Sequence, residues 1–263
     1  MRLNDFTALG RSIDFSFPTN RAIALLVLVT ALAGAALHGD AGQGLQDGLA
    51  VFFAWALARE LDPDHDMSAF VAVAFLLVGL LLWGVPLQGC FWLLLVIRVV
   101  NRTTGLTATP IDSLIVLALA LTLRQNWGVM AISSVAFGMD AVLAPAPRRQ
   151  FLFAAVGLGL TVMLVIQNGP VVFSGAAALF ALLLSLPLLP LSREVTSLTD
   201  ATDQKMQPLR IRAGLFVAAL AGVEMALWSG APGLLALMPL WAAVLGTATY
   251  QIWRRDSSAS KAA

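Results

Sequence analysis

The sequence has little charge. Asp, Glu, Lys and Arg make up 12% of its 263 residues, about half the share that covers the surface of a soluble domain. An ordinary soluble globular protein is therefore excluded. A single cysteine excludes a disulfide scaffold, and two histidines argue against a haem or a histidine-rich metal centre. The net charge of +1 gives no basic surface for nucleic acid, so no nucleic-acid partner is expected.

Apolar residues are abundant instead. They make up 59% of the chain, and the mean hydropathy is +0.85. A helix needs about 17–25 apolar residues to cross a bilayer. The sequence therefore predicts an all-α polytopic transmembrane helix bundle of about ten spans (range eight to ten), a single integral membrane domain over residues 1–263 with the lipid bilayer as its partner. The ten apolar runs are 22–38, 45–60, 68–85, 87–100, 111–123, 127–144, 151–167, 171–191, 211–229 and 233–251, of which the fourth and fifth are short.

The distribution of basic residues tests this number of spans. Lys and Arg collect on the cytoplasmic side of short loops. If the N-terminus is cytoplasmic and ten spans alternate, all of the 16 Lys and Arg residues except Arg124 fall inside or at an inner helix end. Loss of one middle span would invert everything after it and destroy this bias. The sequence therefore predicts that both termini are cytoplasmic, in a multi-pass protein of the inner (plasma) membrane.

Three segments lie outside the predicted spans. Residues 1–21 combine phenylalanines with polar residues, which is typical of a cytoplasmic or interfacial segment. Residues 192–210 form the longest polar stretch and predict a cytoplasmic loop that links eight spans to the last two. Residues 254–263 predict a disordered tail.

An acidic loop follows the second run. Hard carboxylate oxygens can bind Mg²⁺, which would bridge to a phosphate or diphosphate, and His65 could transfer a proton. Alternatively, Asp62-Pro63 ends one helix, and Asp64 or Asp66 caps the next. The candidate metal ligands are Glu60, Asp62, Asp64 and Asp66.

The next predicted cytoplasmic loop is basic. Arg98 and Arg102 are four residues apart, so they share one face of a helix. Two guanidinium groups followed by Thr103, Thr104 and Gly105 could bind an anion such as phosphate. The alternative is that both arginines only anchor a helix end at the membrane surface.

Asp112 has a structural explanation. Thr109-Pro110-Ile111-Asp112 places Thr at the N-cap, Pro at the first helical position and an acid three residues beyond the cap. This pattern predicts a capping box.

Ionisable residues inside the spans mark candidate functional positions, because a charge in hydrocarbon is costly without a partner. Asp140 lies near the inner end of the sixth run, where an ion pair with Arg98 or a substrate contact is expected. Glu224 lies within the ninth run and is a candidate functional residue. The alternative is a structural role, in which a protonated Glu224 is hydrogen-bonded to a neighbouring helix. Asp47 lies near the outer end of the second run, where it lines the pathway or caps its own helix.

Two functions follow from these residues. The first is a secondary transporter or permease for a small solute or ion, with Asp47 and Glu224 in the outer half of a polar pathway and Arg98 with Asp140 in the inner half. The alternative is a membrane-embedded, Mg-dependent enzyme that acts at the cytoplasmic face on a phosphorylated or lipid-linked substrate. A structural subunit of a membrane complex is the third possibility. No nucleotide-binding, zinc-protease or serine-hydrolase motif is present.

Overall fold

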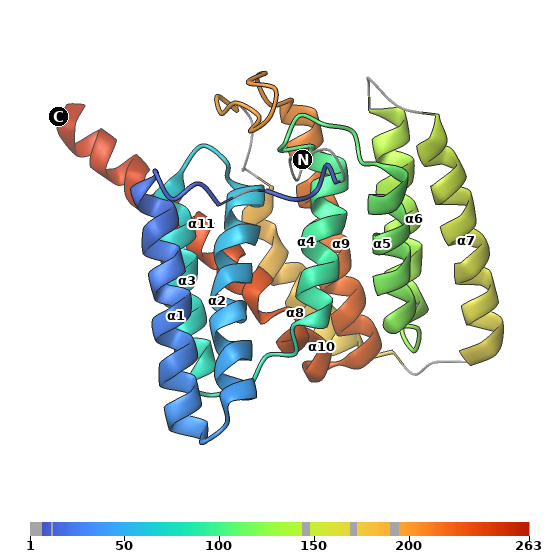
Figure 1. Cartoon of the computed structure of the whole chain (residues 1–263), viewed down its shortest axis with the longest axis horizontal. Helices are drawn as coiled ribbons and strands as arrows, with labels where there is room; N and C mark the ends of the chain where they lie inside the picture. The colour runs from blue at the N-terminus through green and yellow to red at the C-terminus, as the bar shows by residue number, and fades with distance from the viewer. Residues whose placement is uncertain (1–6, 12, 144–147, 169–172, 190–194, 263) are drawn as a thin grey trace. The chain divides into compact units, whose positions relative to one another are not determined.

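The described part of the chain is helical. The computed structural model describes residues 7–11, 13–143, 148–168, 173–189 and 195–262 (Figure 1). Across these ranges no β-strand occurs, and only an isolated bridge joins Leu198 and Lys205. The elements are α1 (Pro18–His38), α2 (Ala41–Leu61), α3 (Asp66–Leu80), α4 (Gln88–Asn101), α5 (Pro110–Thr122), α6 (Trp127–Val142), α7 (Arg149–Asn168), α8 (Gly175–Ser185), the short 3-10 helix η2 (Leu186–Leu188), α9 (Pro208–Ser229), α10 (Ala231–Ala236) and α11 (Met238–Ala262).

The all-α prediction is confirmed for these residues. A helix lies in each of the ten apolar runs, and the tenth run is divided between α10 and α11. Three of the described helices, α1, α7 and α9, are long and apolar enough to cross a membrane, which indicates a membrane protein. Five other described helices are apolar but have only 10–17 residues. Ten spans with cytoplasmic termini therefore stay a prediction.

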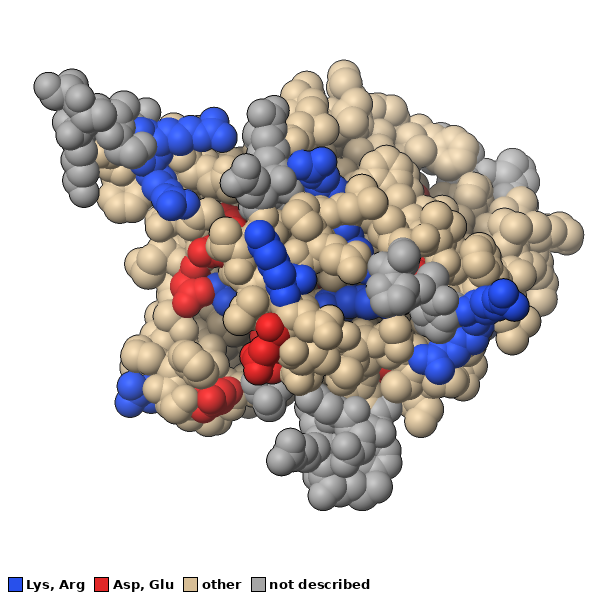
Figure 2. All heavy atoms as spheres, turned by 90° about the horizontal axis from the view of Figure 1, so that it is seen from above, with Lys and Arg blue, Asp and Glu red and all other residues tan. Residues whose placement is uncertain are grey.

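The chain divides into two compact units. Unit 1 comprises Met1–Ser12, Phe91–Leu183 and Ser192–Leu234, and unit 2 comprises Ile13–Cys90, Leu184–Leu191 and Leu235–Ala263. Basic and acidic side chains both lie on the face drawn in Figure 2, among a larger area of other residues.

Small residues set the packing of unit 2. A Cβ atom added to Gly44 of α2 would overlap the carbonyl oxygen of Ala31 in α1, and one added to Gly48 would lie 2.7 Å from the carbonyl oxygen of Val27. Gly44 and Gly48 are four residues apart, so they lie on the same face of α2. Two small residues at this spacing let helix backbones approach closely, a common arrangement in membranes.

In unit 1, α6 packs antiparallel to both α7 and α9. The rings of Phe137 and Phe153 lie 5.9 Å apart between α6 and α7. Nearer the middle of these helices, Gly157 of α7 packs against the hydroxyl of Ser134 in α6. Between α6 and α9, hydrogen bonds join Asp140 to Arg210 at one end and Asn126 to Glu224 at the other. The α6 helix thus carries contacts to two neighbours over its whole length.

The structure describes parts of the three segments outside the predicted spans. Residues 7–11 contact the rest of unit 1 through hydrogen bonds. In the loop, the backbone N–H groups of Asp200 and Ala201 donate to the carbonyls of Thr103 and Thr104, so this loop is packed in unit 1. The α11 helix includes residues 254–262 where the sequence predicts a disordered tail. Residues 1–6, 12, 192–194 and 263 of these segments lie outside the described residues.

Candidate functional site

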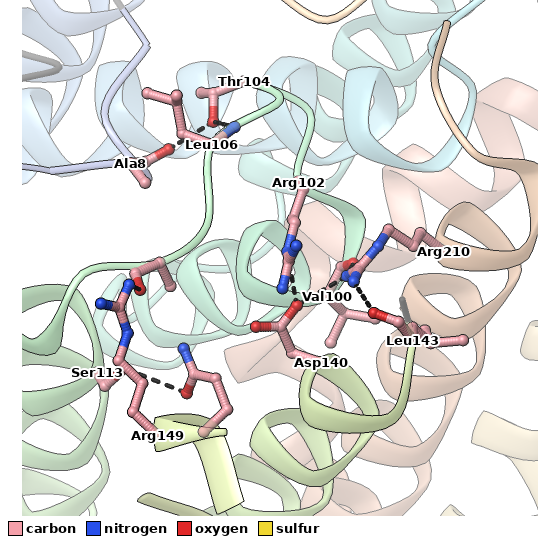
Figure 3. A network of polar contacts seen from close by, with 12 residues as sticks. Ala8, Val100, Arg102, Thr104, Leu106, Ser113, Asp140, Leu143, Arg149 and Arg210 are labelled. Atoms are coloured by element: carbon pink, nitrogen blue, oxygen red, sulfur yellow. Dashed lines mark hydrogen bonds and ion pairs between the residues drawn. The ribbon is translucent and has the colours of Figure 1, made fainter. Parts of the chain in front are cut away.

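Asp140 is the centre of a buried charged cluster in unit 1. Its side chain is fully buried near the C-terminal end of α6. The Oδ1 atom accepts hydrogen bonds from Nε of Arg102 at 2.8 Å and from Nη1 of Arg210 at 2.7 Å. Both arginines are themselves buried. Figure 3 shows the two guanidinium groups converging on this one oxygen. We call Arg102, Asp140 and Arg210 the Asp140 cluster.

The backbone turn after α4 positions Arg102. The helix ends at Asn101, and Arg102 has a φ of 51°, in the left-handed region. This conformation costs a non-glycine residue of order 1–3 kcal/mol and persists only where its surroundings fix it. Gly105, at φ 82°, completes the turn and packs against Thr199 and Thr202 of the 195–207 segment. The packed loop therefore supports the turn that places Arg102.

Arg210 connects three helices. It lies in the first turn of α9, which begins at Pro208. Besides its bond to Asp140, Nη1 donates to the carbonyl of Val100 in α4 at 3.0 Å, and Nη2 donates to the carbonyl of Leu143 at the end of α6. A cation beside the last carbonyls of a helix also interacts favourably with its dipole. The cluster therefore fixes the adjacent ends of α4 and α6 to α9.

Among the described residues, the buried polar atoms near this end of unit 1 that have no hydrogen-bond partner include Oδ2 of Asp140 and Nε2 of Gln150. Both of these side chains are fully buried. Gln150 lies in the first turn of α7, where its Oε1 accepts a hydrogen bond of 3.4 Å from Ser113 of α5. A buried unsatisfied polar atom costs about 1–3 kcal/mol, so the presence of several such atoms in one region requires an explanation.

Glu224 forms a second polar cluster in unit 1. Nδ2 of Asn126 donates to its Oε2 at 3.2 Å, whereas the buried Oε1 has no hydrogen-bond partner. The side-chain oxygen of Asn126 also caps α6 by accepting from the N–H of Gly128 at 3.1 Å. The carboxyl group rests against Gly128, where a Cβ atom would overlap it. Fourteen residues, about 21 Å of helix, separate Glu224 from Arg210 along α9.

The residues that the sequence predicts around Asp140 are only partly those found. Asp140 pairs with Arg102 and Arg210 instead of Arg98, whose Nη1 donates to the carbonyl of Leu9 at 2.9 Å. The two predicted anion-binding arginines thus have different partners within the protein. Sequence reasoning missed Arg210 because it lies within the predicted loop 192–210, although Pro208 is a typical first helical residue and signals the start of α9.

The capping box at Asp112 is confirmed. Its N–H donates to Oγ1 of Thr109 at 3.2 Å, and its Oδ2 accepts from the N–H of Thr109 at 2.7 Å. Oδ2 also accepts from the N–H of Ala8 at 2.9 Å, and Oδ1 accepts from the hydroxyl of Thr7. The sequence did not predict this second role, in which Asp112 holds residues 7 and 8 in place.

The acidic loop of unit 2 does not gather its carboxylates. Oδ1 of Asp62 lies 2.8 Å from Nδ1 of His65, and Asp66 forms an ion pair with Arg59. Nε2 of His65 is in contact with Arg254. Glu60 is fully buried, and Asp64 is half-buried.

Among the residues that the structure describes, no three His, Cys, Asp or Glu side chains form a group that could hold a metal ion. The loop therefore gives no geometric support to the predicted Mg²⁺ site. The alternative explanation holds in part: Asp62 is the C-cap of α2, but His65 rather than an aspartate occupies the N-cap of α3.

Asp47 belongs to unit 2. Its Oδ1 accepts from Nε2 of Gln43 at 3.0 Å, and its Oδ2 lies 3.4 Å from Nε2 of His38. The N-cap of α2 is Asp40, so Asp47 is not the cap of its helix.

Comparison of the chain with protein-family models gives no match, and comparisons with curated proteins and with solved structures give none either.

Proposed function

We propose that this protein is a secondary transporter or permease for a small solute or ion in the inner membrane, with both termini cytoplasmic. The observation that supports it best is the antiparallel α6–α9 pair of unit 1, which carries the buried Asp140 near one end and the half-buried Glu224 near the other. Asp140 and Glu224 each keep one oxygen without a hydrogen-bond partner. Intramembrane carboxylates that face a bundle interior are typical of proton relays and solute pathways.

The two carboxylates have different roles in this proposal. Asp140 is paired with two arginines, and these contacts hold three helix ends together. Among the described residues, Glu224 accepts a hydrogen bond from the amide of Asn126 and forms no ion pair. Its carboxyl group can therefore gain and lose a proton without breaking an ion pair, and we assign proton coupling to Glu224.

The enzyme alternative has less support. Its Mg²⁺ ligands are dispersed over separate contacts, and the two arginines assigned to phosphate donate to Asp140 and Leu9. Neither arrangement brings a metal and an anion together in the described residues.

Solute-driven proton movement tests the proposal. The purified protein is reconstituted in liposomes loaded with the pH dye pyranine and diluted into buffers that each contain inorganic phosphate, sulfate, nitrate, glycine, glutamate, glucose or choline. We expect at least one solute to change the internal pH faster than in protein-free liposomes, and Glu224→Gln to abolish that change because the amide cannot carry the proton.

Asp200→Asn is the matched control, since Asp200 is an exposed carboxylate of the same unit, paired with Arg11. It should retain the wild-type rate. Equal rates in wild type, Glu224→Gln and protein-free liposomes for every solute would refute the proposal.

A further inference from the structure

The two unpartnered atoms of Asp140 and Gln150 belong to helices that face each other. Phe137 of α6 contacts Phe153 of α7, and Ser134 contacts Gly157. Residues three apart on a helix share one face. Asp140 follows Phe137 by three residues in α6, and Gln150 precedes Phe153 by three residues in α7. Because the two helices are antiparallel, Asp140 and Gln150 lie on the facing sides of the pair, next to the Phe137–Phe153 contact.

The surroundings of Asp140 and Gln150 indicate where their unpartnered atoms lie. Figure 3 shows the second oxygen of Asp140 turned away from both arginines, towards the side of the view where Ser113 lies. Ser113 is the residue that donates to Gln150. Five elements therefore contribute buried polar side chains to this end of unit 1, among them Arg102 of the α4–α5 turn, Ser113 of α5, Asp140 of α6, Gln150 of α7 and Arg210 of α9.

The charges of these side chains limit what can bind there. Two guanidinium groups and one carboxylate leave one positive charge in excess. Asp112, the buried acid of α5, is engaged with donors of residues 7, 8 and 109. Excess positive charge among buried side chains disfavours a cation and favours an anion.

The unpartnered atoms limit the ligand further. Nε2 of Gln150 is a donor and requires an acceptor, which any oxyanion provides. Oδ2 of Asp140 is an acceptor and requires a donor. An anion without hydrogen, such as sulfate or nitrate, would place an oxygen against this carboxylate oxygen, whereas an anion with an O–H group would donate to it.

We propose that the Asp140 cluster with Gln150 binds a small oxyanion that carries its own O–H group, of the class of hydrogen phosphate. Arg102, Arg210 and Gln150 provide positive charge and donors, and Asp140 selects for the O–H. This inference rests on the proposed function, because it names the class of solute that the transporter carries, but binding can be measured without transport.

The test is equilibrium binding to the full-length protein in detergent. Isothermal titration calorimetry is performed near neutral pH with sodium phosphate, arsenate, sulfate and nitrate, of which only the first two carry an O–H group there. We expect phosphate and arsenate to bind, with sulfate and nitrate weaker by about tenfold or more, as for the loss of one hydrogen bond to a charged group.

Gln150→Leu removes the donor without touching the ion pairs, and should weaken phosphate binding by about tenfold. Thr161→Val is its matched control, because Thr161 is a buried polar residue of the same helix whose hydroxyl bonds within α7 to Gly157. It should bind phosphate as the wild type does. A Gln150→Leu variant that elutes as folded protein and binds phosphate normally would overturn the proposal.

Two other results would also overturn it. If sulfate and nitrate bind as tightly as phosphate, Asp140 does not select for an O–H group. If none of the four anions binds, the unpartnered atoms are satisfied by a buried water or by each other. The proposed function is judged separately: uptake of another solute with no anion binding refutes only this inference, and phosphate binding with no solute-driven flux refutes only the transport function.

Discussion

Asp140 accepts two buried arginines on one carboxylate oxygen, so each of the three charges depends on the others. Removal of one member of a buried ion pair leaves its partners without compensation and costs about 3–5 kcal/mol. We therefore expect Asp140→Ala to lower the free energy of unfolding by about this amount, measured by denaturant unfolding in mixed micelles.

An exposed ion pair gives the comparison for this loss. Arg11 and Asp200 are paired at the surface of the same unit, and exposed pairs contribute about 0–1 kcal/mol. Asp200→Asn should therefore change the stability little. Similar losses in the two variants would show that the Asp140 cluster does not stabilise the helix ends.

Gly128 gives a second prediction at this scale. A Cβ atom there would overlap the carboxyl group of Glu224, whereas a Cβ atom on Gly138 of the same helix would meet nothing within 4 Å. Overpacking of a core costs about 1–3 kcal/mol, and Ala in place of Gly in a helix gains about 0.5–1 kcal/mol.

We therefore expect Gly128→Ala to destabilise the protein and Gly138→Ala to be neutral or stabilising, measured as a shift in Tm. Gly128→Ala should also alter solute-driven proton movement, because it displaces the Glu224 side chain. A Tm that is equal or higher in Gly128→Ala than in Gly138→Ala would argue against the contact.

At this scale, the candidate carboxylates could be found from the sequence, but their partners could not. Asp140 and Glu224 stand out in the sequence because they are carboxylates within apolar runs. The partner of Asp140 could not be predicted from helix spacing, because the left-handed turn at Arg102 redirects the chain after Asn101. Gln150 shows no sequence signal, since only the packing of α7 on α5 and α6 makes it a buried residue without a full set of partners.

At the scale of elements, the positions of the helices were predictable because apolar runs and helices coincide. Helices begin where the local sequence predicts a start: α5 begins after the N-cap Thr109 with Pro110 as its first residue, and α9 begins at Pro208. The polar segments were less predictable, because their structure depends on contacts distant in sequence. The loop 195–207 packs on the turn at Thr103 and Thr104, about a hundred residues earlier, and no local pattern contains that information.

The N-terminal segment yields a prediction at this scale. Asp112 accepts hydrogen bonds from Thr7, Ala8 and Thr109, so one carboxylate both caps α5 and holds residues 7 and 8. Thr7→Val removes one of these bonds and leaves the capping box intact. We expect faster trypsin cleavage after Arg11 in this variant with a nearly unchanged Tm, because the segment is released while the bundle is not.

Asp112→Ala should release the segment and also lower the stability by about 0.5–2 kcal/mol through loss of the cap interaction. The pair of variants separates the two roles of this residue. Slow cleavage in both variants would mean that other contacts, such as the bond from Thr104 to the carbonyl of Ala8, are sufficient to hold the segment.

At the scale of the whole molecule, composition and helix length give different information. Low charge and high hydropathy indicate a membrane protein, and three described helices are long and apolar enough to cross a membrane. The other apolar helices are shorter than a bilayer requires, so their topology depends on the charge distribution alone. The ten-span prediction can therefore be tested by finding out on which side of the membrane each loop lies.

Two glutamines provide a matched test of that topology. Gln125 lies in the turn between α5 and α6, which the alternation of spans places outside, and Gln204 lies in the loop that it places inside. Both are exposed. In a Cys90→Ala background, we expect Gln125→Cys to react with a membrane-impermeant maleimide in intact cells, and Gln204→Cys to react only after permeabilisation. If both variants react in intact cells, an odd number of the spans between residues 125 and 204 is wrongly assigned. If only Gln204→Cys reacts there, the whole orientation is inverted. In that case the Asp140 cluster would not face the cytoplasm as the proposed transport pathway requires.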